Sequence, residues 1–312
     1  MRILKYILLV LSLSISSALP VYSSPIEPDS GQMPKVPEYL EFAGERIRFD
    51  RADMRERLDR ELIAFTYSHS TSILMIKRAN RYFPQVEPIL KAQGLPDDMK
   101  YLMVIESNLD PQALSAAGAA GLWQFTQSTA RAYGLEVNSN IDERYDLKKE
   151  TVAACKYLLS AYEKYGDWLT VAASYNAGQN GISARLENQH QTRAVDLWLL
   201  NETSRYMFRL LVAKMMFENP AQFGFHLSAD ELYPFVPCKD TVEVTETVAD
   251  LVTFAESHGV TYADLKRENL WLRESSLKDT SHKLYKVAIP DVKGLHYNPR
   301  HIRPHNPAWV TK

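Results

Sequence analysis

The chain has 312 residues, of which 46% are hydrophobic, so it can bury one sizeable core and a smaller module besides. Charged residues make up 24% and the formal net charge is −2. A protein that binds nucleic acid normally carries a strong basic excess, so we expect no nucleic-acid partner.

The N-terminus has the pattern of a secretory signal. Arg2 and Lys5 come first, an apolar run follows at residues 6–15, and small polar residues begin at Ser16. The run is too short to span a bilayer comfortably, which favours a cleaved signal peptide over an uncleaved anchor. We predict a signal peptide at residues 1–24, export to the periplasm or cell envelope, and no transmembrane helix in the mature chain.

Residues 25–49 are predicted to be a linker, because residues 23–37 are rich in Pro, Ser and Gly. From residue 50 to 220, apolar residues recur at three- to four-residue spacing without any alternation of period two. This pattern predicts a compact all-helical domain at 50–225, with Asp146 and Asp167 as helix caps and Gly166 as a helix end. The expected helices are 51–67, 72–81, 85–93 (after a break at Pro84), 98–107, 146–165, 167–175 and 202–217.

The composition changes after Phe223. Short strands are predicted at 241–244 and 285–289, with two short helical patterns between them at 248–258 and 262–269. We therefore expect a small βααβ module at residues 238–291. The remaining residues, 292–312, are rich in His, Pro and Asn and are expected to form an irregular tail.

The chain has two cysteines, Cys155 and Cys238, and neither lies near the predicted signal cleavage region. We therefore expect no lipidation cysteine there. Export would permit a disulfide between the two. Because Cys155 lies in an apolar helical stripe, a buried free thiol is the interpretation that we prefer.

Glu106 is the first candidate for chemistry. It ends a largely apolar helix and is followed by a loop of very small residues at 115–121, which would let a bulky ligand approach the backbone. Burial and the negative end of the helix dipole should both raise its pKa. A carboxylic acid that is still protonated near neutrality is what protonation of a glycosidic oxygen requires. The alternative is a solvated glutamate at a helix end.

Three further motifs offer polar or aromatic groups, and each also has a structural interpretation. Residues 121–125 combine Trp123 with the amide of Gln124, but a core Trp–Phe pair is favoured for this motif alone. Tyr175 and Asn176 offer a phenol and an amide, or else a core tyrosine and a helix C-cap. Glu202 and Tyr206 share one helix face, although Glu202 also suits the first turn of a helix.

Other chemistries lack a motif. There is no HExxH pattern and no paired CxxC, so we predict no metal site and no cofactor. A G-x-S-x-G elbow and a phosphate-binding glycine loop are also missing from the sequence.

Together these motifs resemble the soluble-lytic-transglycosylase superfamily. The pairs Glu106–Ser107 and Glu202–Thr203, the runs 121–124 and 175–178, and Tyr206 occur in that superfamily's order and approximate spacing. Residues 81–84 and 94–98 look like the membrane-bound lytic murein transglycosylase D branch. The resemblance covers about residues 50–220 and implies a mainly α, goose-lysozyme-like catalytic domain that binds the glycan strands of peptidoglycan.

The resemblance also implies a mechanism with one glutamate, whereas most glycosidases use two carboxylates. By this analogy Glu106 protonates the bond between N-acetylmuramic acid and N-acetylglucosamine. It then deprotonates the muramoyl 6-hydroxyl, which attacks its own anomeric carbon to give a 1,6-anhydro sugar. The analogy assigns the orientation of Glu106 to Ser107 and Tyr206, the holding of sugar groups to Gln124 and Tyr175, and the stabilisation of the cationic transition state to Asn176.

The C-terminal module is similar to a LysM peptidoglycan-binding module. Residues 245–247, 259–261, 264–265 and 289–290 fall in that module's order, with an insertion around 273–282. The alternative is a small structural cap that binds nothing. We expect a monomer.

Two alternatives to a transglycosylase remain open at this point. A goose-type lysozyme would need a second acid to activate water, and Asp110, Asp142 and Asp146 are nearest by sequence. The other alternative is a wall-binding scaffold without catalysis, in which Glu106→Gln would leave the biological effect intact.

Overall fold

Helices make up most of the chain between residues 52 and 218, as the sequence predicts. The computed structural model describes residues 33–278 and 283–311, so the predicted signal peptide lies outside the described residues. All of the described residues belong to one compact unit, Gln32–Lys312. The long helices of this unit are α1 (Ala52–Tyr67), α2 (His69–Gln93), α5 (Leu147–Tyr165) and α8 (Asn201–Glu218).

The predicted linker at 25–49 is wrong over its second half. Strands β1 (Tyr39–Phe42) and β2 (Glu45–Arg48) pair as an antiparallel hairpin. Ala43 and Gly44 both have positive φ, which suits the tight turn between the strands. Phe42, Ile47 and Phe49 are buried in the helical core, and this burial explains why the segment is ordered.

The predicted break at Pro84 is also wrong, because α2 continues from His69 to Gln93 with Pro84 and Pro88 inside it. Each proline removes one backbone donor from the helix. Phe83, Val86 and Leu90 are fully or almost fully buried on the face toward the core. Packing of this apolar face therefore outweighs the local preference for a break.

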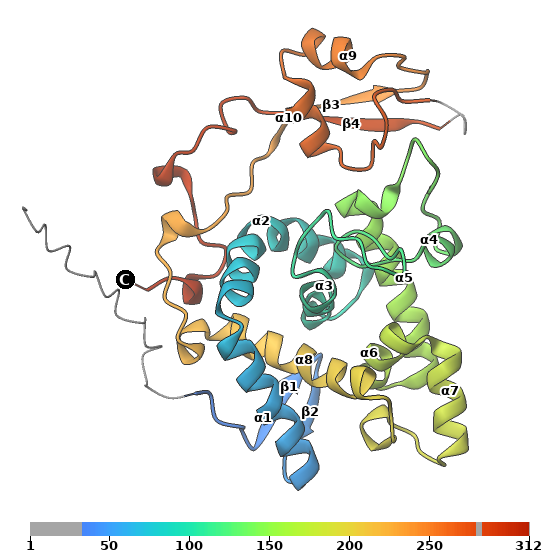
Figure 1. The fold of residues 1–312 in the computed structure, drawn as a ribbon, viewed down its shortest axis with the longest axis vertical. Helices are drawn as coiled ribbons and strands as arrows, with labels where there is room; N and C mark the ends of the chain where they lie inside the picture. The colour runs from blue at the N-terminus through green and yellow to red at the C-terminus, as the bar shows by residue number, and fades with distance from the viewer. Residues whose placement is uncertain (1–32, 279–282, 312) are drawn as a thin grey trace, which may run out of the picture. The chain divides into compact units, whose positions relative to one another are not determined.

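The short helix α3 (Lys100–Ser107) follows a 3-10 turn at Asp97–Met99 and lies among the longer helices (Figure 1). It packs against α2 and α8, and α5 packs against α2 and α6 (Trp168–Ala177). Residues Lys100 to Ile105 of α3 are all buried. A helix enclosed on all sides holds its last residues, including Glu106, in a fixed place.

The predicted caps of α5 and α6 are confirmed. The side chain of Asp146 accepts hydrogen bonds from the backbone N–H groups of Lys148 and Lys149 at the start of α5. Gly166 ends α5 in the left-handed conformation, and Asp167 accepts from the backbone N–H of Thr170 in α6. These caps satisfy donors and carbonyls that a helix end leaves without partners.

Helices α4 (Gln127–Ala132) and α7 (Gln179–Asn188) were not predicted. Ala130 is the buried residue of α4 and Ile182 is that of α7. A helix that buries so little has no apolar stripe, so its periodicity is missing from the sequence.

The C-terminal module, residues 238–290, has the predicted βααβ order. Strands β3 (Cys238–Val244) and β4 (Tyr285–Pro290) are antiparallel, and α9 (Leu251–Ser257) and α10 (Tyr262–Glu268) lie between them in the chain. The module has its own apolar core. That core also contains Ile141, which comes from the loop between α4 and α5.

The tail after residue 291 returns to the helical core rather than remaining without contacts. It forms 3-10 turns at Pro299–His301 and Pro307–Trp309. Trp309 is buried beside Phe83 and Phe217, and its indole N–H donates a 2.8 Å hydrogen bond to the carbonyl of Phe217.

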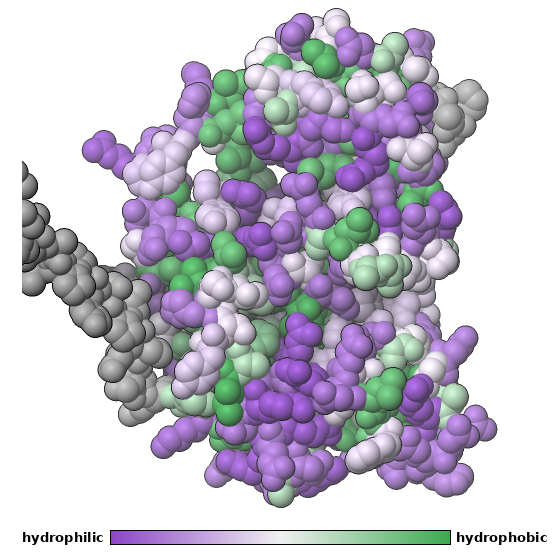
Figure 2. Space-filling view, in the orientation of Figure 1, coloured by the Kyte–Doolittle hydropathy of each residue, from purple (hydrophilic) through white to green (hydrophobic). Residues whose placement is uncertain are grey.

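Hydrophilic residues dominate the face shown in Figure 2, and hydrophobic residues form separate patches on it. Within residues 33–278 and 283–311, no helix combines the length and apolar character needed to cross a membrane. Both cysteines are free thiols, and Cys155 is buried as predicted while Cys238 is exposed.

Candidate active site

Glu106 lies in the last turn of α3, half-buried among the helices that enclose this element. Loss of solvation raises the pKa of its carboxyl to about 7. A hydrogen bond from Tyr206 and the positive charge of Arg209 oppose this rise, whereas the negative charge of Glu202 adds to it. The predicted rise in pKa is confirmed, so a large share of the carboxyl is protonated at neutral pH.

Tyr206 of α8 is the direct partner of Glu106. Its hydroxyl donates a 2.6 Å hydrogen bond to Oε1 of Glu106, and the residue is 3% exposed. Burial raises the pKa of Tyr206 well above its usual value, so the phenol keeps its proton and acts as a donor. The structure thus pairs Tyr206 with Glu106, and the role of Tyr206 in orienting the acid stays a prediction.

The resemblance assigns the orientation of Glu106 to Ser107, but the hydroxyl of Ser107 forms its hydrogen bond elsewhere. Its hydroxyl donates a 2.9 Å hydrogen bond to the carbonyl of Met103, one turn earlier in α3. Ser107 follows Glu106 on the helix and is therefore rotated by about 100° from it. The rotation directs its hydroxyl to the backbone of its own helix instead of to the carboxyl of Glu106.

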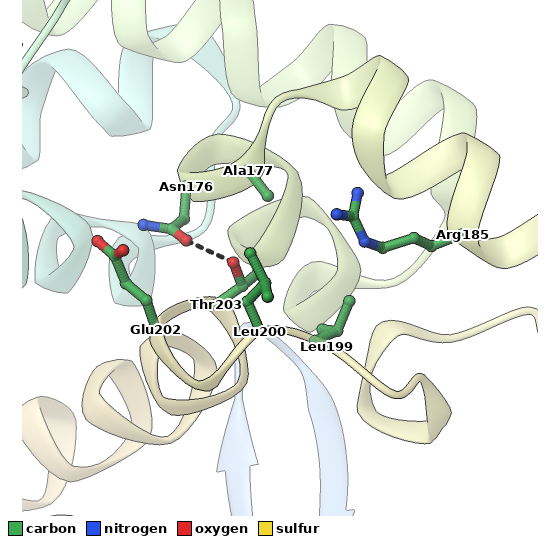
Figure 3. A pocket seen from close by; sticks show the side chains of 7 residues that line it. All are labelled: Asn176, Ala177, Arg185, Leu199, Leu200, Glu202 and Thr203. Atoms are coloured by element: carbon green, nitrogen blue, oxygen red, sulfur yellow. Dashed lines mark hydrogen bonds between the residues drawn. The ribbon is translucent and has the colours of Figure 1, made fainter.

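Tyr175 and Asn176, in the last turn of α6, both make specific contacts. The hydroxyl of Tyr175 donates a 2.7 Å hydrogen bond to the carbonyl of Trp123. Burial raises the pKa of Tyr175 well above its usual value, and the nearby charge of Glu106 acts in the same direction. Asn176 is not a C-cap, because the helix ends at Gly178; its Oδ1 accepts a 2.9 Å hydrogen bond from Thr203 of α8 (Figure 3).

Gln124 lies in a tight turn with φ of 51°. Its amide nitrogen donates to the carbonyls of Ala113 (3.1 Å) and Gly121 (2.8 Å), so the amide oxygen is the group that it can offer to a ligand. Trp123 is fully buried, and its indole N–H donates to the hydroxyl of Thr151. Trp123 is therefore a core residue, as favoured for that motif alone, and presents no ring to a sugar.

Two buried ionisable groups hold this turn, and sequence reasoning missed both. The carboxyl oxygens of Glu150 accept hydrogen bonds from the backbone N–H groups of Leu122 and Trp123, at 3.3 and 3.1 Å, and burial raises the pKa of Glu150 well above its usual value. The guanidinium of Arg144 donates to the carbonyls of Gly118 (2.7 Å) and Phe125 (3.0 Å). Both are ionisable residues in a helical or apolar stretch of the sequence. That position could have indicated that their side chains are buried.

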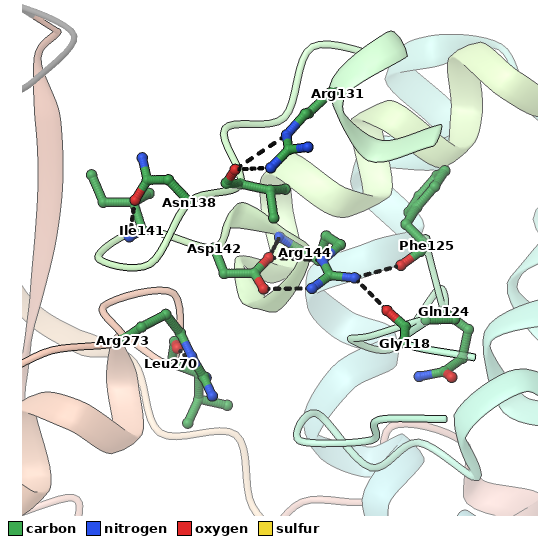
Figure 4. A network of polar contacts seen from close by, with 12 residues as sticks. Gly118, Gln124, Phe125, Arg131, Asn138, Ile141, Asp142, Arg144, Leu270 and Arg273 are labelled. Carbon is green, nitrogen blue, oxygen red and sulfur yellow. Dashed lines mark hydrogen bonds and ion pairs between the residues drawn. The ribbon is translucent and has the colours of Figure 1, made fainter. Parts of the chain in front are cut away.

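Arg144 is in turn paired with Asp142, at 2.7 and 2.9 Å (Figure 4). Both side chains are buried. Burying an unpaired charge is costly, so this pair and the carbonyls it binds form one unit. The backbone N–H of Asp142 donates to the carbonyl of Trp271, which connects the unit to the C-terminal module.

The three acids considered for a hydrolase all have structural partners. Asp110 forms an ion pair with Arg78, Asp142 pairs with Arg144, and Asp146 caps α5. None of these contacts is with Glu106. Glu202 is instead the acid whose charge affects Glu106.

A cavity of about 240 Å³ lies beside these residues, between α6, α7 and the start of α8. Figure 3 shows the side chains around it. The lining residues are Asn176, Ala177, Arg185, Leu199, Leu200, Glu202 and Thr203. In the part of the chain that the structure describes, no group of three His, Cys, Asp or Glu residues could hold a metal ion.

Comparison with protein families agrees with this geometry. Residues 87–197 match the model described as the transglycosylase SLT domain. This chain contains a transglycosylase SLT domain. Residues 240–293 match the soluble lytic transglycosylase C-terminal LysM-like domain, so the βααβ module is a LysM-like domain. The resemblance predicted from the motifs is confirmed.

Among curated proteins, the SLT-domain chain is homologous to membrane-bound lytic murein transglycosylase D of Escherichia coli K12. The two are 28% identical over 245 residues, which is 76% of this chain and 52% of the relative. The chain thus spans about half the length of that relative. Peptidoglycan transglycosylase gp16 of Escherichia phage T7 is 40% identical over 79 residues, which cover 25% of this chain and 6% of the phage protein.

Among solved structures, the chain is similar to lytic transglycosylase Slt from Pseudomonas aeruginosa, with a TM-score of 0.40 and 19% identity. The match covers 51% of this chain and 30% of the other. The 70-kDa soluble lytic transglycosylase in complex with bulgecin A also gives a TM-score of 0.40, with 17% identity over 54% of this chain and 31% of the other.

Proposed function

We propose that this protein is a peptidoglycan lytic transglycosylase. It would cleave the β-1,4 bond between N-acetylmuramic acid and N-acetylglucosamine and form 1,6-anhydro-N-acetylmuramic acid. The observation that carries the proposal is a carboxyl of pKa about 7 at Glu106, inside a transglycosylase SLT domain.

Glu106 acts first as an acid. It transfers its proton to the glycosidic oxygen, the bond from that oxygen to C1 of the muramoyl residue breaks, and N-acetylglucosamine leaves with a free 4-hydroxyl. A pKa near the working pH is the value at which one group can give and take a proton efficiently. The bond from Tyr206 stabilises the carboxylate that remains.

Glu106 acts next as a base. Its carboxylate takes the proton from the 6-hydroxyl of the same muramoyl residue, and O6 forms a bond with the cationic C1. The 1,6-anhydro ring closes, Glu106 is protonated again, and no water is consumed. A single group thus completes the cycle without a second carboxylate.

The remaining residues of the site position the reacting groups. The amide oxygen of Gln124 accepts hydrogen bonds from the sugar, because its amide nitrogen is already engaged. Asn176 uses its Oδ1 on Thr203 and has its amide N–H groups for a sugar oxygen. Tyr175 supports the turn that carries Gln124 through its bond to Trp123. Such a fixed polar set supplies electrostatic stabilisation that needs little reorganisation.

One observation favours this reaction over the hydrolase, and another favours it over a binding scaffold. The acids Asp110, Asp142 and Asp146 are held in structural contacts and are not free to activate water. The raised pKa of Glu106 suits a catalyst better than it suits a binding scaffold. Export to the periplasm or cell envelope completes the proposal and rests on the N-terminal sequence pattern. We also expect the protein to be a monomer.

The test is digestion of purified sacculi by the full chain and by Glu106→Gln, with products analysed by mass spectrometry. We expect anhydro products, lighter than hydrolytic products by one water, and a rate loss of at least about 100-fold in the variant. Glu163→Gln, an exposed residue of α5, is the matched control and should keep the wild-type rate. A near-normal rate for Glu106→Gln, or products that have gained water, would overturn the proposal.

A further inference from the structure

The cavity beside Asn176 contains a cation without an acidic partner. Arg185 of α7 donates to the carbonyl of Gly181 in its own helix, at 2.9 Å. Across residues 33–278 and 283–311, no carboxylate forms an ion pair with it. The guanidinium carries five N–H donors, so most of its hydrogen-bonding capacity is available to a ligand in the cavity.

Charge is distributed unevenly around this cavity. Figure 3 shows Arg185 on one side and Glu202 on the other, with Asn176 and Thr203 next to Glu202. Glu202 influences the pKa of Glu106, so its side faces the catalytic acid. A bound anion is therefore expected at the Arg185 side, away from the reacting bond.

The segment before α8 presents large apolar side chains to solvent. Trp198 is 90% exposed and Leu200 is 71% exposed, and Leu199 and Leu200 line the cavity. A tryptophan side chain that is exposed to this extent contributes almost no hydrophobic stabilisation to the folded state. Trp198 directly precedes Leu199 and Leu200, which line the cavity, and an exposed aromatic ring at this position suits contact with the face of a saccharide.

The segment before α8, residues 194–200, is held in place at two points. The amide of Gln189 donates to the carbonyl of Trp198 at 3.0 Å and accepts from its backbone N–H at 2.7 Å. The backbone N–H of Ala194 donates to the hydroxyl of Thr170 at 2.9 Å. Fixing the backbone in advance lowers the entropy cost of binding at Trp198.

The charges of the proposed substrate indicate which part of it the cavity would bind. The glycan backbone of peptidoglycan is uncharged, whereas the peptide stems on its lactyl groups carry carboxylates. A guanidinium binds a carboxylate in a bidentate manner, and adjacent leucines suit the methyl groups of a stem. A bare glycan strand has no group to pair with Arg185.

We propose that Arg185 and Trp198 form a specificity site for glycan strands that carry peptide stems. Arg185 binds a carboxylate of the stem, and Trp198 packs against the saccharide that bears it. This inference rests on the proposed transglycosylase function. It names the part of the substrate, the peptide stem, by which the enzyme would select its glycan strands.

The experiment compares stem-bearing glycan strands with strands whose stems have been removed by an amidase. For Arg185→Gln we expect kcat/KM on stem-bearing strands to fall about 10- to 100-fold, mainly through KM, with little change on bare strands. Arg185→Lys should recover part of the loss, because it restores the charge but not the bidentate geometry. Lys156→Gln removes an exposed positive charge that does not line the cavity and should leave both substrates unaffected.

Trp198→Ala should raise KM about tenfold on both substrates, because the saccharide is common to them. Its exposure means that the change leaves the fold intact. An equal effect of Arg185→Gln on the two substrates, or no effect on either, would overturn the assignment of the stem to Arg185. An unchanged KM in Trp198→Ala would overturn the stacking role. If the wild-type chain cleaves neither substrate, the proposed function itself fails, and this outcome differs from every result that tests the specificity site alone.

Discussion

The hydroxyl of Tyr206 lies 2.6 Å from Oε1 of Glu106, although 100 residues separate the two in the chain. The bond favours the carboxylate, and it opposes the larger effect of burial, which favours the neutral acid. The two effects together place the pKa of Glu106 at about 7. A group that must give a proton and then take one back benefits from this balance.

Tyr206→Phe removes the hydroxyl and keeps the ring. The pKa of Glu106 should then rise above about 7, because the contribution that lowers it is lost. We expect kcat to fall about 10- to 100-fold, the scale of a hydrogen bond to a charged group. A pH–rate profile measures both changes. A fall in kcat with an unmoved pKa would show that Tyr206 acts on packing alone.

The pH dependence of the reaction follows from the same pKa. The free enzyme must carry protonated Glu106 to begin, so kcat/KM should fall about tenfold for each pH unit above about 7. Below that value the profile should stay level until other groups titrate. A rate that stays constant up to pH 9 would contradict the assignment of Glu106 as the acid.

Glu106 should also make the folded protein less stable as the pH rises. Its pKa is about 7 in the folded state and about 4.5 when unfolded, so between these values the native state binds more protons. The free energy of unfolding therefore decreases from pH 4.5 to pH 7, by about 3 kcal/mol from this group. Glu106→Gln should be more stable than wild type at pH 8 and similar at pH 4, as measured by denaturant unfolding at both values. Equal stability at pH 8 would contradict the raised pKa.

The raised pKa of Glu106 could be predicted because this residue ends an apolar helix, and loss of solvation follows from that pattern. The contact of Ser107 could not be predicted from the sequence, because the direction of a hydroxyl depends on helix rotation and on an accepting carbonyl at Met103. The β1–β2 hairpin is missed because the residues just before it have the composition of a linker. The hairpin is ordered by Phe42 and Phe49, which pack against residues that are distant in the chain. Arg144 could not be placed from the sequence, since its partners Gly118 and Phe125 meet only in the folded turn.

Two glycines in the loop before Gln124 allow the effect of a steric clash to be distinguished from the effect of backbone strain. Gly121 has φ of +82°, and a Cβ there would lie 1.8 Å from the carbonyl oxygen of Arg144. Gly118 has φ of +77° and open space around it. Gly118→Ala should cost about 1–2 kcal/mol of stability, from the left-handed conformation alone.

Gly121→Ala must in addition displace backbone and the buried carboxylate of Glu150, so it should cost more than about 4 kcal/mol and abolish activity. Thermal unfolding and sacculus digestion of the two variants provide the comparison. Similar stability losses in the two would show that the loop moves freely away from Arg144.

Ile141 links the helical part of the chain to the LysM-like domain. It is fully buried in that domain's core and forms an antiparallel bridge with Leu272. The next residue, Asp142, donates its backbone N–H to Trp271 and pairs with Arg144, which binds the loop carbonyls of Gly118 and Phe125. Contacts with the LysM-like domain are thus connected, through Asp142 and Arg144, to the turn that carries Gln124.

Ile141→Ala should lower the free energy of unfolding by about 2–5 kcal/mol, because it leaves a cavity in a packed core, whereas Ile141→Val should cost about 1 kcal/mol. The alanine variant should also raise KM for glycan, since the Asp142–Arg144 pair loses its support from Trp271. Denaturant unfolding and steady-state kinetics on the same preparations test both effects. A large stability loss with an unchanged KM would mean that the contact holds the two parts together without shaping the Gln124 turn.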